Sequence, residues 1–174
     1  MFEYSQEDIA AQVANLPLAF RIWFQWMFAV IVLAPILFVR HRQGRVALLF
    51  SLVFFALQIP LMRMVGLTNL LSLTHLVIWG PLVAYLGREL RSGRIRRESL
   101  FGIWAALASA TAIISLVFDL RDFGRWIAGE RGIASPPPEP AIPWMWVGLI
   151  VASLAGAAWY AFGIRTKAEP PALA

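Results

Sequence analysis

Apolar residues dominate the chain in five long runs, which are separated by short polar, glycine- or proline-containing segments. Each run holds about 20 residues, the length that an α-helix needs to cross roughly 30 Å of hydrocarbon. The pattern therefore predicts an all-α integral membrane protein, a bundle of five transmembrane helices. Residues 1–174 should form a single membrane domain, since no polar stretch is long enough for a separate soluble unit. The expected spans are about 18–39, 46–64, 69–87, 100–118 and 143–163.

Three shorter segments have patterns of their own. Ser5 and Asp8 have the spacing of a helix capping box, so residues 1–17 should form either a short helix or a frayed tail. Within 119–131, apolar residues recur at the spacing of an amphipathic helix that lies in the membrane interface, between helices 4 and 5. Residues 135–140, Ser-Pro-Pro-Pro-Glu-Pro, predict a stiff and extended spacer.

The fifth run carries no charge and is rich in small residues. Such a surface lets helix backbones approach closely. We therefore expect this helix to pack against the rest of the bundle or against a second copy of the chain. The small residues are Gly148, Ala152, Ala155, Gly156 and Ala157.

Charged residues are scarce, at 14% of the chain against 60% hydrophobic residues, and the net charge is +5. Ten of the fifteen basic residues fall in 40–45, in 88–99 and in the C-terminal tail, which five spans place on one side. Because cytoplasmic loops are enriched in Lys and Arg, this side should be cytoplasmic and the N-terminus outside. The basic charge thus indicates topology or an anionic-lipid contact, not nucleic-acid binding. Short loops and the use of Arg over Lys favour a bacterial inner (cytoplasmic) membrane.

The residue inventory excludes several kinds of chemistry. The chain has no Cys, so thiolate metal sites and Cys nucleophiles are excluded. Its one Lys, Lys167, follows the last predicted span, so no Schiff base can form inside the bundle. Nucleophile-elbow, phosphate-loop, HExxH and dinucleotide-binding motifs do not occur. We therefore assign no catalytic residue and no metal site, name no cofactor, and consider an enzyme the less favoured class.

Polar residues of several helices fall at one depth near the outer side. Counted from the outer ends at about 1.5 Å per residue, this layer lies about 9–10 Å deep. We interpret it as a candidate ligand-binding pocket that opens to the outer face. The alternative is structural, because intramembrane amides and a packing histidine commonly join helices by hydrogen bonds. The candidate residues are Gln25, Gln58, His75, Trp79, Thr111 and Ser115.

Four ionisable residues stand above this layer, at its rim: Arg21, Arg63, Asp119 and Asp122. The two carboxylates lie at i and i+3 on one helix face, where they repel each other unless a cation lies between them. We expect Arg63 or Arg21 to form an ion pair with them. A bound cation or a general acid–base pair is the alternative interpretation.

Two functions of different classes remain open. The first is a non-enzymatic helical subunit or accessory protein of an inner-membrane assembly, which contacts a protein partner or a second copy through the fifth helix. The second is a membrane sensor, carrier or enzyme that binds a small amphiphile, such as a quinone, lipid, pigment or haem, in the outer pocket. Membrane lipids are partners in either case.

Overall fold

The structure is a computed structural model that describes residues 3–131 and 143–159, with the side chains of the last helix described from Gly148 onward. Every regular element in these ranges is a helix, which confirms the all-α class. Because α2, η1 and α3 follow one another without a gap, we call them together the first long helix. The elements are α1 (Gln6–Ala14), α2 (Leu18–Met27), the π-helical η1 (Phe28–Leu33), α3 (Ala34–Leu37), α4 (Arg42–Val65), the 3₁₀ turn η2 (Asn69–Leu71), α5 (Ser72–Arg91), α6 (Leu100–Ile127) and α7 (Pro143–Ala158).

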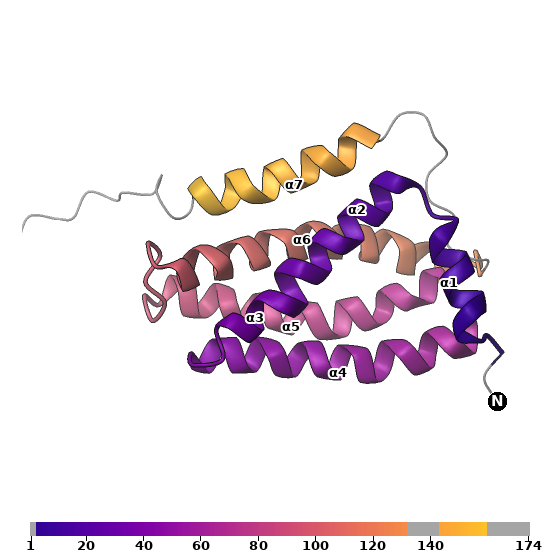
Figure 1. Cartoon of the computed structure of the whole chain (residues 1–174), viewed down its shortest axis with the longest axis horizontal. Helices are drawn as coiled ribbons and strands as arrows, with labels where there is room; N and C mark the ends of the chain where they lie inside the picture. Colours follow the sequence, from indigo (N-terminus) through magenta and orange to yellow (C-terminus); the bar gives the residue numbers. More distant parts are fainter. Residues whose placement is uncertain (1–2, 132–142, 160–174) are drawn as a thin grey trace, which may run out of the picture.

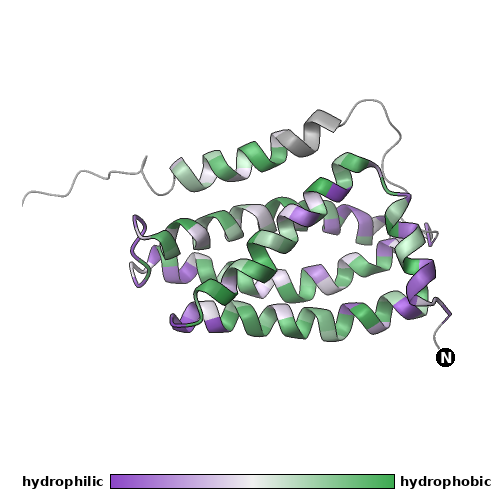
Figure 2. Ribbon diagram, viewed as in Figure 1, coloured by the Kyte–Doolittle hydropathy of each residue, from purple (hydrophilic) through white to green (hydrophobic). Residues whose placement is uncertain are grey.

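Four helical stretches are long and apolar enough to cross a membrane, and they correspond to the first four expected spans. Large apolar side chains cover their outer surface: Leu37 and Leu100, for example, are 80% and 75% exposed. Hydrophilic residues gather at the two ends of the bundle (Figure 2). An apolar exterior of this kind indicates a multi-pass membrane protein, since water would penalise it. The stretches are Leu18–Leu37, Arg42–Val65, Asn69–Arg91 and Leu100–Ile127.

Helix α7 begins where the fifth span was expected, at Pro143. Its apolar stretch within the described residues, Gly148–Ala158, is shorter than a membrane span. Residues 160–163 and the predicted spacer 135–140 lie outside the described residues, so the fifth span stays a prediction. The expected contact with the bundle is present, because α7 packs against α6 and the first long helix (Figure 1).

Helices α4, α5 and α6 lie side by side, and the first long helix crosses them (Figure 1). The turns that follow α3 and α5 meet at one end of the bundle. There the ring of His41 stacks on Phe101 with 4.3 Å between centroids, and Nε2 of Gln43 donates to Glu89 at 3.0 Å. The two arginine-rich turns therefore share one end, and α1 lies at the other.

Helix α1 is folded onto this other end, and it is not a frayed tail. Its capping box is complete, because Ser5 Oγ accepts from the Asp8 N–H and the Asp8 carboxylate accepts from the Ser5 N–H. Hydrogen bonds from the Ser5 side chain and backbone lower the pKa of the Asp8 carboxyl. Gln12 then joins α1 to the turn between α4 and η2, since its Oε1 accepts from the N–H of Leu67 at 3.0 Å.

Pro35 leaves two backbone carbonyls of the first long helix without their usual donor. Proline has no N–H, so it cannot donate to Ile31, the α-helical partner, or to Val30, the π-helical partner. Side chains of neighbouring helices replace it. Nε1–H of Trp104 donates to the Val30 carbonyl at 2.9 Å. The Ser51 hydroxyl lies 3.1 Å from the Ile31 carbonyl and shares its one hydrogen between this carbonyl and that of Ala47, at 3.0 Å. The two bonds satisfy the backbone, as hydrocarbon requires, and tie the first long helix to α6 and α4.

Helix α6 runs without a break from Leu100 to Ile127, past the expected boundary at Phe118. Residues 119–127 are its last turns, so the structure contains no separate interfacial helix at this position. The physical reason is that Asp119, which we expected at the rim beyond the fourth span, is buried at 8% exposure. Its carboxylate is satisfied by hydrogen bonds, so this acidic residue does not end the helix.

Candidate functional site

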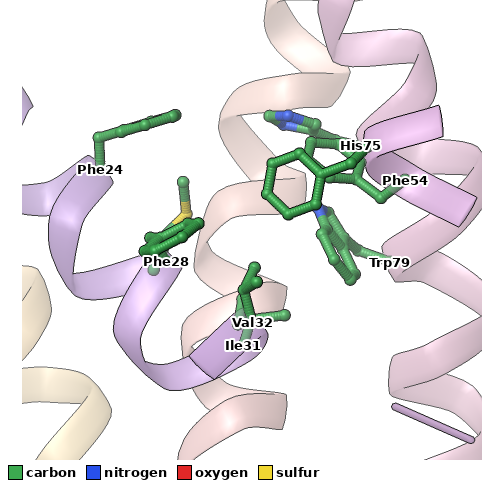
Figure 3. Close-up of a pocket in the computed structure, with 9 residues that line it drawn as sticks. Phe24, Phe28, Ile31, Val32, Phe54, His75 and Trp79 are labelled. Atoms are coloured by element: carbon green, nitrogen blue, oxygen red, sulfur yellow. The ribbon is translucent and has the colours of Figure 1, made fainter. Parts of the chain in front are cut away.

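A cleft lies between the first long helix on one side and α4 and α5 on the other (Figure 3). Its lining is aromatic and aliphatic except at His75, the one titratable side chain in it. The cleft is partly open to the surface, and its volume is about 40 Å³. The lining residues are Phe24, Met27, Phe28, Ile31 and Val32 of the first long helix, Phe54 and Phe55 of α4, and His75 and Trp79 of α5.

The size of the cleft limits what it can enclose. A single water needs about 10–15 Å³ of such space, whereas pockets for drug-sized ligands measure roughly 300–1,000 Å³. The cleft can therefore surround only a fragment of a ligand, a few atoms in size. Phe24 and Phe28 are 52% and 39% exposed, so they offer apolar surface to the rest of a ligand outside the enclosed space.

His75 is held in place by a carboxylate from α6. Its Nδ1 lies 2.8 Å from Oδ1 of Asp119, and the Ser115 hydroxyl donates to Oδ2 of the same carboxylate at 3.1 Å. The side chains of His75 and Asp119 are only 16% and 11% exposed. Phe54 packs on the imidazole with 5.0 Å between ring centroids. Both oxygens of Asp119 are thus used, and the orientation of the ring is fixed.

Helical spacing brings these groups together. His75 and Trp79 are four residues apart on α5, and Ser115 and Asp119 are four residues apart on α6, so each pair shares one helix face. The two faces meet because α5 and α6 pack along each other. Ser72, the first residue of α5, donates its hydroxyl to the carbonyl of Asn69 in η2 at 2.5 Å. The site is therefore built from regular helices and not from loops.

Two of the six predicted pocket residues, His75 and Trp79, line the cleft, and Ser115 supports it through Asp119. The others lie elsewhere. Gln58 accepts a hydrogen bond from the hydroxyl of Thr74 on α5. Thr111, fully buried, accepts one from Nε1–H of Trp26 at 3.2 Å. Gln25 lies on an exposed face of α2. Equal depth thus did not bring all six residues into one pocket.

The rim also differs from expectation. The partner of Asp119 among the described residues is His75, with Nδ1 2.8 Å from Oδ1, where we expected Arg63 or Arg21. Asp122 is paired with its chain neighbour Arg121, at 3.9 Å. Arg21 and Arg63 are half-buried, in the first turn of α2 and the last turn of α4. Asp119 therefore lies beside the cleft, in contact with His75.

The aromatic side of the cleft was missed by the sequence analysis. Phe24, Phe28 and Ile31 recur at i, i+4 and i+7, which marks one face of the first long helix. The same pattern is expected of a helix face that contacts lipid, so it did not single out a binding site. Phe54 and Phe55 lie in a continuous apolar run of α4 and gave no signal at all.

The described part of the chain brings no three His, Asp, Glu or Cys side chains together in a way that could hold a metal ion. What the cleft offers instead is a hydrogen bond from an oriented imidazole, inside an apolar and aromatic surface. No protein-family model, curated protein or solved structure matches this chain.

Proposed function

We propose that this chain is a membrane-embedded binding protein, a sensor or carrier, for a small amphiphile whose polar end hydrogen-bonds to His75. The observation that carries this proposal is the His75–Asp119 pair beside an apolar cleft. Ionisable groups are rare in hydrocarbon, and they usually mark binding or transport sites. Asp119 holds the ring through Nδ1, and none of the hydrogen bonds formed by the described residues uses Nε2. A second hydrogen-bonding position therefore remains for a ligand.

The geometry also supports an amphiphile over a water-soluble ligand. The cleft encloses a few atoms only, and exposed phenyl rings continue its surface outward. An amphiphile with its polar head at His75 and its apolar tail along Phe24 and Phe28 would contact both the cleft and the exposed rings. The tail can then stay in the bilayer while the head is bound.

The proposal is tested by the small molecules that co-purify with the protein. We expect protein extracted from its native membranes to retain an amphiphile that mass spectrometry detects, and His75→Leu to retain about tenfold less, a loss equivalent to about 1.4 kcal/mol. His41→Leu is the matched control, because it makes the same substitution at the end of the bundle away from the cleft. Equal retention by the two variants contradicts the proposal.

A second function, a helical subunit of a bacterial inner-membrane assembly, is favoured by the exposed face of α7. Gly148, Ala152 and Gly156 recur at i, i+4 and i+8 on this face, whereas Ser153 and Ala157 are buried against the bundle. No atom of a neighbouring element lies within 4 Å of a Cβ built on either glycine. Small residues at this spacing let another transmembrane helix approach closely. The partner would be another polypeptide or a second copy.

Cross-linking in native membranes tests this second function. We expect Gly156→Leu to reduce recovery of the cross-linked partner or dimer several-fold, because a large side chain separates the helices. Val151→Leu, on an exposed part of the same helix, should leave recovery unchanged. A chain that runs as a lone protomer, with no co-purifying polypeptide, contradicts this role.

We further propose the orientation of the bundle in the membrane. The two arginine-rich turns, 40–45 and 88–99, lie at the same end, which supports a cytoplasmic position for that end by the positive-inside rule. The N-terminus and α1 are then outside and the C-terminus is cytoplasmic. The cleft at His75 lies in the outer half of the bundle in this orientation.

A further inference from the structure

We infer that the ligand of the cleft presents a hydrogen-bond acceptor, the carbonyl oxygen of a flat conjugated ring such as a quinone, to an N–H at Nε2 of His75. This inference rests on the proposed function and names the ligand class of the same site. It follows from the proton positions that the His75–Asp119 pair can adopt, and from the shape of the lining.

The Ser115 hydroxyl donates to Oδ2 of Asp119, so we consider the arrangements in which Oδ2 carries no proton. Two of these have no net charge. In one, an imidazolium faces a carboxylate; in the other, a neutral imidazole accepts at Nδ1 from a protonated carboxyl. Nε2 carries a proton in both. The third arrangement, with a bare Nε2 and an ionised Asp119, leaves a net negative charge in an apolar surrounding, which a low dielectric disfavours most. His75 therefore presents a hydrogen-bond donor, Nε2–H, to the cleft and not an acceptor.

Other charged groups on the elements around the cleft are matched or lie towards its outer end. On α6, Asp122 is matched by Arg121 at 3.9 Å, and Arg125 by Glu130 at 2.5 Å. The first long helix and α4 each contribute an arginine towards the outer end, Arg21 and Arg63. Among the ion pairs of the described residues, that of Asp119 is with His75. His75 and Asp119 are thus the ionisable groups in direct contact at the cleft.

The lining selects a flat group. Trp79 and Phe54 pack at 4.7 Å between centroids with 37° between their planes, and Phe28 meets Phe55 edge-on at 6.1 Å. Aromatic faces and edges of this kind stack well with a planar ring. The small volume of the cleft admits the edge of such a ring with its oxygen, but not a phosphate headgroup. An isoprenoid or alkyl tail would remain in the bilayer.

Three matched probes test the inference on the full chain in lipid nanodiscs: 2-alkyl-1,4-naphthoquinone, 2-alkyl-1-naphthol and 2-alkylnaphthalene. Binding is measured by equilibrium dialysis with mass spectrometry, and binding to empty nanodiscs is subtracted. We expect the quinone to bind about tenfold more tightly than the other two. His75→Leu should abolish this preference while it leaves alkylnaphthalene binding unchanged, and the variant His75→Asn, which keeps an N–H donor, should restore part of it.

The outcomes separate the inference from the function on which it rests. Saturable binding with the naphthol preferred, or with equal affinity for all three probes, overturns the carbonyl assignment and leaves the amphiphile-binding function standing. A quinone preference that persists in His75→Leu also overturns the assignment, because His75 is then not the donor. No saturable binding of any probe overturns the proposed function, and the inference with it.

Discussion

Replacement of Asp119 by Leu should lower the free energy of unfolding by about 3 kcal/mol, because it leaves the His75 imidazole without its partner in an apolar surrounding. Neutral hydrogen bonds inside membrane proteins average only about 0.6 kcal/mol. The larger value is expected here because both groups are ionisable and nearly buried, and because Ser115 loses its acceptor as well. Unfolding of the solubilised protein by titration with a denaturing detergent measures the change.

The double variant His75→Leu with Asp119→Leu tests whether the loss of stability in Asp119→Leu comes from the unpaired His75. With both ionisable groups removed, the Ser115 hydroxyl is the one group of this site that has lost its partner, so most of the lost stability should return. Asp122→Leu is the matched control on the same helix. Its side chain is 34% exposed and its ion pair is loose, so the expected change is below about 1 kcal/mol. If Asp119→Leu is no less stable than Asp122→Leu, the His75–Asp119 contact does not contribute to the free energy of unfolding.

The location of this pair could have been found from the sequence by a different count. His75 lies roughly 24 Å before the end of α5 at Arg91, and Asp119 lies roughly 29 Å after the start of α6 at Leu100, along helices that rise 1.5 Å per residue. The two residues therefore reach similar heights from the shared turn. We missed this because we expected the fourth span to end at about residue 118, which placed Asp119 at the rim above the polar layer.

Other features of the fold and the site could not be predicted by counting residues along the helices. Depth in the membrane fixes the height of a side chain but not its direction around the helix axis, which is why Gln25 was expected in the pocket and lies on an exposed face. The π-helical stretch before Pro35 is hydrogen-bonded by Ser51 and Trp104, which belong to helices far away in the sequence. The residues around Pro35 alone do not predict these contacts. The four helices that are long and apolar enough to cross a membrane, in contrast, follow from run length and apolarity alone.

Gly102→Ala and Gly44→Ala should each destabilise the bundle by about 1–3 kcal/mol, because the added methyl group would overlap backbone atoms. A Cβ on Gly102 would lie 2.1 Å from the carbonyl oxygen of Arg96, and one on Gly44 would lie 2.1 Å from that of Phe38. Both glycines lie in the first turn of a long helix, where the preceding turn folds back on it. Backbone cannot move aside as a flexible side chain can, so the turn itself must shift.

Two glycines of the same bundle provide controls of the opposite sign. Gly80 in α5 and Gly124 in α6 have no neighbouring atom within 4 Å of the position that an added Cβ would take, so alanine meets no obstacle there. Alanine in a helix interior is favoured over glycine by roughly 0.5–1 kcal/mol, so Gly80→Ala and Gly124→Ala should be slightly stabilising. Detergent-induced unfolding of all four variants compares them directly. A loss of stability at Gly102 and Gly44 beside a gain at Gly80 and Gly124 assigns the effect to the close backbone contacts, whereas four changes of the same sign refute that assignment.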